Sequence, residues 1–183
     1  MDFEFANTGI SGIVLARSKR SIDERGTFIK GYEPKPFSSI IQTNFVEDYV
    51  SISSKSVIRG LHYQVKPKTQ GKLITVVSGK IYDVAIDLRR DSSAFGQYVS
   101  NELSSFGIDT IWISPGFAHG FLSLVDNTII LTRCTNEFSP ETERGIRWND
   151  PNFRIKWPTR SPILSSKDGK WPYLPDISQY GIS

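Results

Sequence analysis

The segment KLITVVSGKIYDVAIDL, residues 72–88, decides the fold class of this chain because its apolar and polar side chains alternate. A period of two residues is typical of β-strands, in which successive side chains point to opposite faces. Ser78-Gly79 is a turn signal between two β-branched runs, so we predict a β-hairpin here. Beyond the turn, one face carries Tyr82, Val84, Ile86 and Leu88, and the other carries Asp83, Ala85 and Asp87.

The same period recurs along the chain, and helical patterns are scarce. A second hairpin is predicted in HGFLSLVDNTIILTRCT (119–135), with Asp126-Asn127 at its tip. Further strands are expected at 12–15, 27–31, 49–53, 98–103 and 110–113, and short helical turns at 37–42 and 163–170. From Trp148 onward, proline and tryptophan are frequent, which indicates an ordered C-terminal tail packed on the β domain. Many short strands predict an all-β sandwich or barrel.

Size and composition indicate one globular domain, residues 1–183. The formal net charge is +3, and the basic residues are scattered, so we expect no nucleic-acid partner. No stretch is long and apolar enough to cross a membrane, and the N-terminus has no apolar signal region. Cys134 is the only cysteine, which fits a reducing compartment, and we expect the protein in the cytoplasm.

The two histidines lie in RGLHYQ (59–64) and SPGFAHGF (114–121), each beside a glycine in a β context. His62 and His119 could be ordinary packed histidines. A metal site is disfavoured, because no second histidine or obvious carboxylate completes a ligand set near His62. A general base in a pocket is the better use, since imidazole titrates near neutral pH. Such a base needs an orienting carboxylate. Periodicity alone nominates Asp83, although a solvent-exposed Asp83 fits the pattern equally well.

Three cations stand close to glycines, where the backbone can approach a ligand: Arg25, Arg59 and Lys72. Arginine binds phosphate oxygens in two-point contacts, and lysine supplies a compact positive charge. Each of the three could equally be a solvated surface cation. Their shared context favours a small anionic ligand.

Five segments together resemble the dTDP-4-dehydrorhamnose 3,5-epimerases, cupin-fold enzymes of nucleotide-sugar biosynthesis. They are RGLHYQ, QGKLITVVSGKIYDVAIDLR, FGQYVSNELS, IWISPGFAHGFLSL and ERGIRWNDPNFRIKWP, and they occur in the family's order. The resemblance covers nearly the whole chain, from DERGTF near residue 23 to LSSKD near residue 168. It implies a double-stranded β-helix (jelly-roll cupin), a homodimer with strand exchange, and no metal or organic cofactor. The implied substrate is a nucleoside-diphosphate 4-keto-6-deoxy sugar.

The resemblance also implies roles for individual residues. His62 is the expected base, and Asp168 replaces Asp83 as its orienting carboxylate. Lys72 is expected to stabilise the enolate oxygen in a water-poor pocket. His119 is expected to line the sugar site, and Arg59 to contact the diphosphate. Arg25 is also expected to contact the diphosphate, from the partner subunit, and Glu143 and Lys167 are further ligand-binding positions.

The chain departs from the family's pattern at several of these positions. Thr132 stands where the family has the tyrosine that reprotonates the sugar, and its hydroxyl is a far weaker acid than a phenol of pKa ~10. Phe138 replaces a tyrosine that stacks on the nucleotide base. The remaining departures are Glu47, Asp48 and Tyr49 in place of a Gln-Asp-Asn run, and Lys30 in place of a glutamate.

Three explanations of these departures stay open. The enzyme could epimerise one carbon only, C3 in preference to C5, because one face has lost its proton donor. A replacement donor could act instead, either Tyr49 or a water held by Thr132. Finally, the protein could bind nucleotide sugars without catalysis. A 3,4-ketoisomerase of the same fold is a further alternative.

Overall fold

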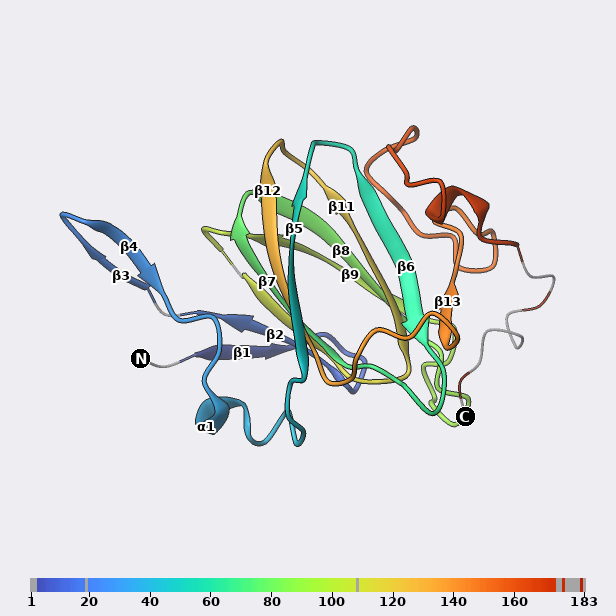
Figure 1. Cartoon of the computed structure of the whole chain (residues 1–183), viewed down its shortest axis with the longest axis horizontal. Helices are drawn as coiled ribbons and strands as arrows, with labels where there is room; N and C mark the ends of the chain where they lie inside the picture. The colour runs from blue at the N-terminus through green and yellow to red at the C-terminus, as the bar shows by residue number, and fades with distance from the viewer. Residues whose placement is uncertain (1–2, 19, 108, 174–175, 177–181, 183) are drawn as a thin grey trace.

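Two antiparallel sheets lie face to face in the computed structural model, which describes residues 3–18, 20–107, 109–173, 176 and 182 (Figure 1). The six-stranded sheet has the order β1 (Glu4–Asn7), β2 (Ile13–Arg17), β10 (Thr110–Ile113), β7 (Lys72–Ser78), β12 (Thr128–Cys134), β5 (Glu47–Ser53). The five-stranded sheet has the order β13 (Glu143–Gly145), β6 (Ile58–Gln64), β11 (Phe117–Ser123), β8 (Lys80–Asp87), β9 (Tyr98–Ser104). Isoleucine, valine and phenylalanine side chains from both sheets fill the space between them.

The strand pairing is nested. β5 pairs with β12, β6 with β11, β7 with β10, and β8 with β9, all antiparallel. The first and third of these pairs lie in the six-stranded sheet, and the other two lie in the five-stranded sheet. This arrangement is a double-stranded β-helix, so the predicted all-β jelly-roll fold is confirmed.

Both predicted hairpins are wrong. β7 and β8 are consecutive, but they belong to different sheets, and so do β11 and β12. At Gly79 (φ +90°) the chain passes from one sheet to the other, and a Cβ there would lie 2.6 Å from the Thr128 hydroxyl. A turn residue marks a change of chain direction, but it does not specify which strand the next segment will pair with.

The alternating faces of β8 follow the prediction, and both of them are buried. Val84, Ile86 and Leu88 pack on the outer side of the sheet against tail residues that include Phe153. Asp83 and Ala85 point to the interior between the sheets, where both are fully buried. The tail therefore covers the outer face of this sheet, as the aromatic-rich composition predicts.

The other sequence predictions differ from the structure mainly at their ends. The segment 110–113 coincides with β10, and those at 12–15, 27–31, 49–53 and 98–103 overlap β2, β4 (Gly26–Ile29), β5 and β9. The predicted turn at 37–42 shares only Phe37 with the helix α1 (Pro34–Phe37), and that at 163–170 contains the 3-10 helix η1 (Asp168–Lys170). The prediction missed β1, β3 (Arg20–Asp23) and β13.

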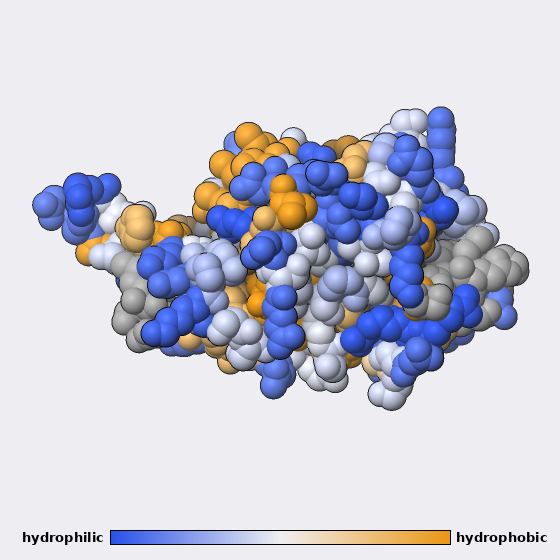
Figure 2. All heavy atoms as spheres, turned by 60° about the horizontal axis from the view of Figure 1, so that its bottom comes forward, coloured by the Kyte–Doolittle hydropathy of each residue, from blue (hydrophilic) through white to orange (hydrophobic). Residues whose placement is uncertain are grey.

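Two apolar surfaces remain exposed on the described part of the chain. β3 and β4 form a two-stranded arm that projects from the sheets (Figure 1) and exposes Ile22 and Phe28. Val50, Ile52 and Val77 are exposed on the six-stranded sheet. Figure 2 shows apolar atoms gathered on the surface beside the arm. Among the described residues, no helix has the length and apolar character needed to cross a membrane.

Candidate active site

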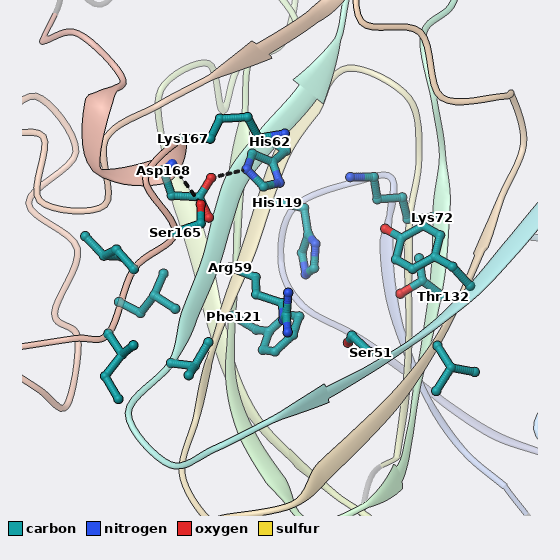
Figure 3. Close-up of a pocket in the computed structure, with 16 residues that line it drawn as sticks. Ser51, Arg59, His62, Lys72, His119, Phe121, Thr132, Ser165, Lys167 and Asp168 are labelled. Atoms are coloured by element: carbon teal, nitrogen blue, oxygen red, sulfur yellow. Dashed lines mark hydrogen bonds and ion pairs between the residues drawn. The ribbon is translucent and has the colours of Figure 1, made fainter.

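A cavity of about 540 Å³ opens between the two sheets and the C-terminal tail (Figure 3). Strands β5, β6, β7, β11 and β12 line it together with residues 163–168. A second lobe of about 300 Å³ adjoins it, and three residues line both lobes: Tyr49, His62 and Lys72. The two lobes together are large enough for a ligand with several chemical parts.

His62 forms a hydrogen-bonded pair with Asp168 on one wall of the cavity (Figure 3). Its Nε2 lies 2.6 Å from Oδ1 of Asp168, a residue that the tail brings back 106 positions later. Burial tends to raise the pKa of Asp168, but hydrogen bonds from His62, the Gly60 amide and Ser165 outweigh it and lower the pKa. The carboxylate therefore stays ionised and can only accept, which places the hydrogen of a neutral imidazole on Nε2 and leaves a lone pair on Nδ1.

Gly60 explains why RGLHYQ carries a glycine two residues before its histidine. A Cβ at Gly60 would lie 2.6 Å from the Cα of Gly120 and 2.7 Å from the carbonyl oxygen of His119. Only glycine permits this approach of β6 to β11, and its φ of +120° also disfavours other residues. The Gly60 amide then donates to Oδ2 of Asp168 at 3.3 Å, which fixes the second oxygen of the carboxylate.

His119 forms the second pair, and its partner is Asp83. Nε2 of His119 lies 2.7 Å from Oδ2 of Asp83, and both side chains are buried. The assignment of Asp83 to His62 from periodicity is therefore wrong, and so is the alternative of an exposed Asp83. The strand alternation does turn Asp83 toward a histidine, but register places the other histidine within its reach. His62 and His119 are direct partners across β6 and β11.

The opposite wall carries Lys72 and Thr132, which Figure 3 shows across the cavity from His62 and Asp168. Lys72 is buried on β7, and this desolvation lowers the pKa of its amine. Thr132 on β12 is paired in register with Tyr49 on β5, so the two side chains point to the same face. Tyr49 keeps 44% of its surface exposed, while the wall around its phenol desolvates it and raises its pKa.

Arg59 lies at the end of the cavity nearest Ser51 and Phe121 (Figure 3). Its Nε donates to the Ser53 hydroxyl at 3.0 Å, and one terminal nitrogen donates to the Ile52 carbonyl at 3.2 Å. These bonds hold the guanidinium at the cavity, and its other N–H groups, which have no partner among the described residues, can bind an anion.

The second lobe brings together Glu47, Phe138 and Glu143, all of them predicted site residues. The Phe138 amide donates to Glu47 at 2.6 Å, and Lys167 forms an ion pair with Glu143 at 2.7 Å. Lys167 also lies 5.8 Å from the centre of the Phe138 ring. An exposed aromatic face beside charged groups suits a flat polar ring such as a nucleobase.

Three predicted site residues do not line the cavity of this chain. Arg25 lies on the arm, where it forms an ion pair with Asp23 in an exposed position. Lys30 pairs with Glu33 at 3.0 Å, and Asp48 lines another hollow, which shares Glu47 with the second lobe. The roles of these three residues in ligand binding stay predictions.

Several cavity residues had no signal in the sequence. Ser51, Phe121 and Ser165 line the first lobe, and Gln70 lines the second. Trp171 packs edge-on against His62, with the ring centres 6.3 Å apart, and it occupies the space that a side chain at position 145 would need. Among the described residues, no three His, Cys, Asp or Glu side chains are grouped as metal ligands. The His62–Asp168 pair and the buried Lys72 amine are groups that can take part in acid–base chemistry.

Comparison with known proteins agrees with this geometry. The family model described as dTDP-4-dehydrorhamnose 3,5-epimerase matches residues 7–176. A dTDP-4-dehydrorhamnose 3,5-epimerase of Shigella flexneri is 41% identical over 163 residues, which are 88% of this chain and 90% of that protein.

Two solved structures are also similar. A Legionella pneumophila 3,5-epimerase in complex with dTDP-4-keto-L-rhamnose superposes with a TM-score of 0.91 at 37% identity, over 99% of this chain and 98% of that one. A Streptomyces bikiniensis 3'-monoepimerase in complex with dTDP-quinovose has a TM-score of 0.83 at 26% identity, over 90% of this chain and 84% of that one.

Proposed function

Because the chain belongs to the dTDP-4-dehydrorhamnose 3,5-epimerase family and is a sugar-nucleotide epimerase, we propose that it inverts a nucleoside-diphosphate 4-keto-6-deoxy sugar beside the ketone. The hydrogens on C3 and C5 are acidic because both carbons flank the C4 carbonyl. Removal of either one gives an enolate, and a proton returned to the opposite face completes the inversion. The observation that carries this proposal is an oriented imidazole facing a buried amine across one cavity.

His62 is the proposed base. Asp168 accepts the hydrogen on Nε2 and so presents the lone pair of Nδ1 to a carbon-bound proton. It also stabilises the imidazolium that forms, as carboxylates do in other histidine pairs. A positioned base of this kind contributes about 10²–10⁴-fold to a rate.

Lys72 is the proposed partner of the enolate oxygen. Its ammonium form lacks solvation in the buried wall, which is why its pKa is lowered. A negative oxygen that develops beside it supplies the missing counter-charge, so the interaction is stronger in the transition state than in the ground state.

Substrate binding is assigned to the cations and the aromatic ring around the reacting centre. Arg59 contacts the diphosphate, His119 lines the sugar site, and Phe138 stacks on the base. Glu143 and Lys167, already paired with each other, complete the nucleotide side. We assign the altered Glu47-Asp48-Tyr49 run and Lys30 to recognition of a nucleotide or sugar that differs from the family's usual one.

We propose inversion at C3, with C5 as the second possibility. Thr132 stands where the resemblance places an acid tyrosine, and a threonine hydroxyl does not take over a phenol's role as an acid. The Streptomyces bikiniensis monoepimerase shows that this fold is found in an enzyme named for inversion at a single carbon.

A homodimer with strand exchange is the proposed assembly, with each 183-residue chain forming one domain in the cytoplasm. The arm exposes Ile22 and Phe28, and the six-stranded sheet exposes apolar residues that a second copy of the chain would cover. Arg25, on the arm, would then reach the partner's cavity, which accounts for its distance from the site in its own chain.

The test is incubation with a dTDP-4-keto-6-deoxyhexose in heavy water, followed by NMR. We expect deuterium and inversion at C3. Equal inversion at C3 and C5 would contradict the restriction to C3. Tight nucleotide binding with no exchange would favour the binding-module alternative, and a carbonyl moved from C4 to C3 would indicate a ketoisomerase. Arg59→Ala serves as a control for binding, because it should raise KM more than it lowers kcat.

A further inference from the structure

Inversion needs proton donors and acceptors on opposite faces of the sugar ring. The base and its carboxylate stand on the wall formed by β6 and the tail, whereas Lys72 and Thr132 stand across the cavity (Figure 3). The keto sugar held between these walls loses a carbon-bound proton toward His62 and becomes a planar enolate. The acid must therefore lie on the wall formed by β5, β7 and β12.

That wall offers few groups able to release a proton. The hydroxyls of Thr132 and Ser51 are very weak acids, and Lys72 is engaged with the enolate oxygen in the mechanism proposed above. Tyr49 is the phenol on this wall among the described cavity residues, and it lines both lobes. The other lining phenol, Tyr63, is buried in the cluster beneath the tail.

The strand register links Tyr49 to the family's missing acid. Tyr49 and Thr132 are directly opposite in the β5–β12 pair, with their side chains on the same face. Neighbouring strands lie about 4.8 Å apart, so a phenol moved from position 132 to position 49 remains on the same wall. The chain lacks the family's tyrosine at position 132 but has a tyrosine at position 49. Because these positions are opposite each other on adjacent strands, the wall keeps one phenol.

We propose that Tyr49 is the general acid of this enzyme and delivers the proton to the enolate carbon on the face opposite His62. The inference rests on the proposed function. In this step the phenol O–H bond breaks and a C–H bond forms from the enolate electron pair, which restores the C4 carbonyl. The phenolate regains a proton from water, and the imidazolium of His62 releases one, so the enzyme returns to its starting state.

The Tyr49 hydroxyl carries its proton at neutral pH. A phenol is protonated throughout the neutral range, and desolvation raises the pKa of Tyr49 further, which makes it a weaker acid than a free phenol. An enolate carbon is basic enough to take a proton from such a phenol.

The decisive experiment follows Tyr49→Phe in heavy water. His62 still removes the proton and returns deuterium to the same face, so we expect exchange with retention at the reacting carbon, while inversion falls by about 100-fold or more. Tyr82→Phe is the matched control, because its hydroxyl bonds to Ser100 on the outer side of the sheet, away from the cavity. It should invert substrate at the wild-type rate.

Two outcomes overturn the proposal. One is undiminished inversion by Tyr49→Phe. The other is loss of inversion in Thr132→Val but not in Tyr49→Phe, which would assign the proton to a water held by Thr132. The double variant Tyr49→Asn with Thr132→Tyr restores the family's arrangement and should regain inversion, which separates loss of the acid from misfolding. If the wild type shows neither exchange nor inversion, the proposed function itself fails. The wild type is therefore measured before the variants.

Discussion

The two histidine–carboxylate pairs are chemically alike and structurally different. The nitrogen–oxygen distances are 2.6 Å for His62–Asp168 and 2.7 Å for His119–Asp83, and the histidines face each other across neighbouring strands. The side chain of His62 is 26% exposed, however, and that of His119 only 8%. The carboxylate of the first pair comes from the tail, and that of the second comes from the adjacent strand of the same sheet.

Under the proposed mechanism, access to the cavity, rather than the type of pair, separates the base from the second histidine. A base must contact its substrate and exchange its proton with water, which the exposed ring of His62 can do. His119 is fixed at the cavity by a fully buried carboxylate, so it suits a constant hydrogen bond to a ligand. Asp83 also has one oxygen, Oδ1, that is buried without a hydrogen-bond partner among the described residues. Both side chains of the second pair are thus buried in the interior of the protein.

The strongest test of this contrast replaces each histidine by asparagine. His62→Asn should lower kcat by about 10³-fold or more, with nucleotide affinity nearly unchanged, because only proton transfer is lost. His119→Asn should mainly raise KM and lower the melting temperature, since Asp83 loses its buried partner. Deuterium exchange by NMR and nucleotide titration measure the two effects. Equal losses of kcat in both variants would remove the distinction.

The carboxylates provide the second test. Asp168→Asn keeps the size of the side chain but removes the charged acceptor, so kcat should fall by about 10²–10⁴-fold while the fold is retained. Asp83→Asn should instead cost about 1–3 kcal/mol in the free energy of unfolding, because its partner is buried with it. Steady-state kinetics and urea denaturation on both variants separate the roles. A large kcat effect confined to Asp83→Asn would reverse the assignment.

The smallest expected effect is in the acid stability. The pKa of Asp168 is lower in the folded protein than its ordinary value of 3.8. Its ionised form thus stabilises the fold above pH 4, and this contribution is lost as pH falls through the folded pKa. Between pH 5 and pH 3 the wild type should lose more unfolding free energy than Asp168→Asn, by urea denaturation. Asp87 has a lowered pKa too, because its bonds to Arg89 and Ser92 outweigh burial, and it contributes equally in both proteins. Identical slopes would show that the first pair is not coupled to folding.

Particular residues show how far the sequence could predict this site. RGLHYQ identified His62 and Arg59 as cavity residues, and the resemblance added Asp168 and Lys72, which the structure places around the same cavity. The alternation in β8 placed Asp83 on the face opposite Val84 and Ile86, but it could not decide whether that face is buried or which histidine Asp83 contacts. Trp171 and Ser165 had no pattern of their own, because their contribution depends on where the tail packs.

The sequence by itself determined which side chains of a strand share a face, because alternation is a local property of the extended backbone. It also determined that the chain is all-β. Only the tertiary structure decided which strands share a sheet, which carboxylate orients which histidine, and that Tyr49 lies opposite Thr132. Those choices depend on contacts between segments far apart in the chain, and a local sequence pattern does not identify the distant segment that it will contact.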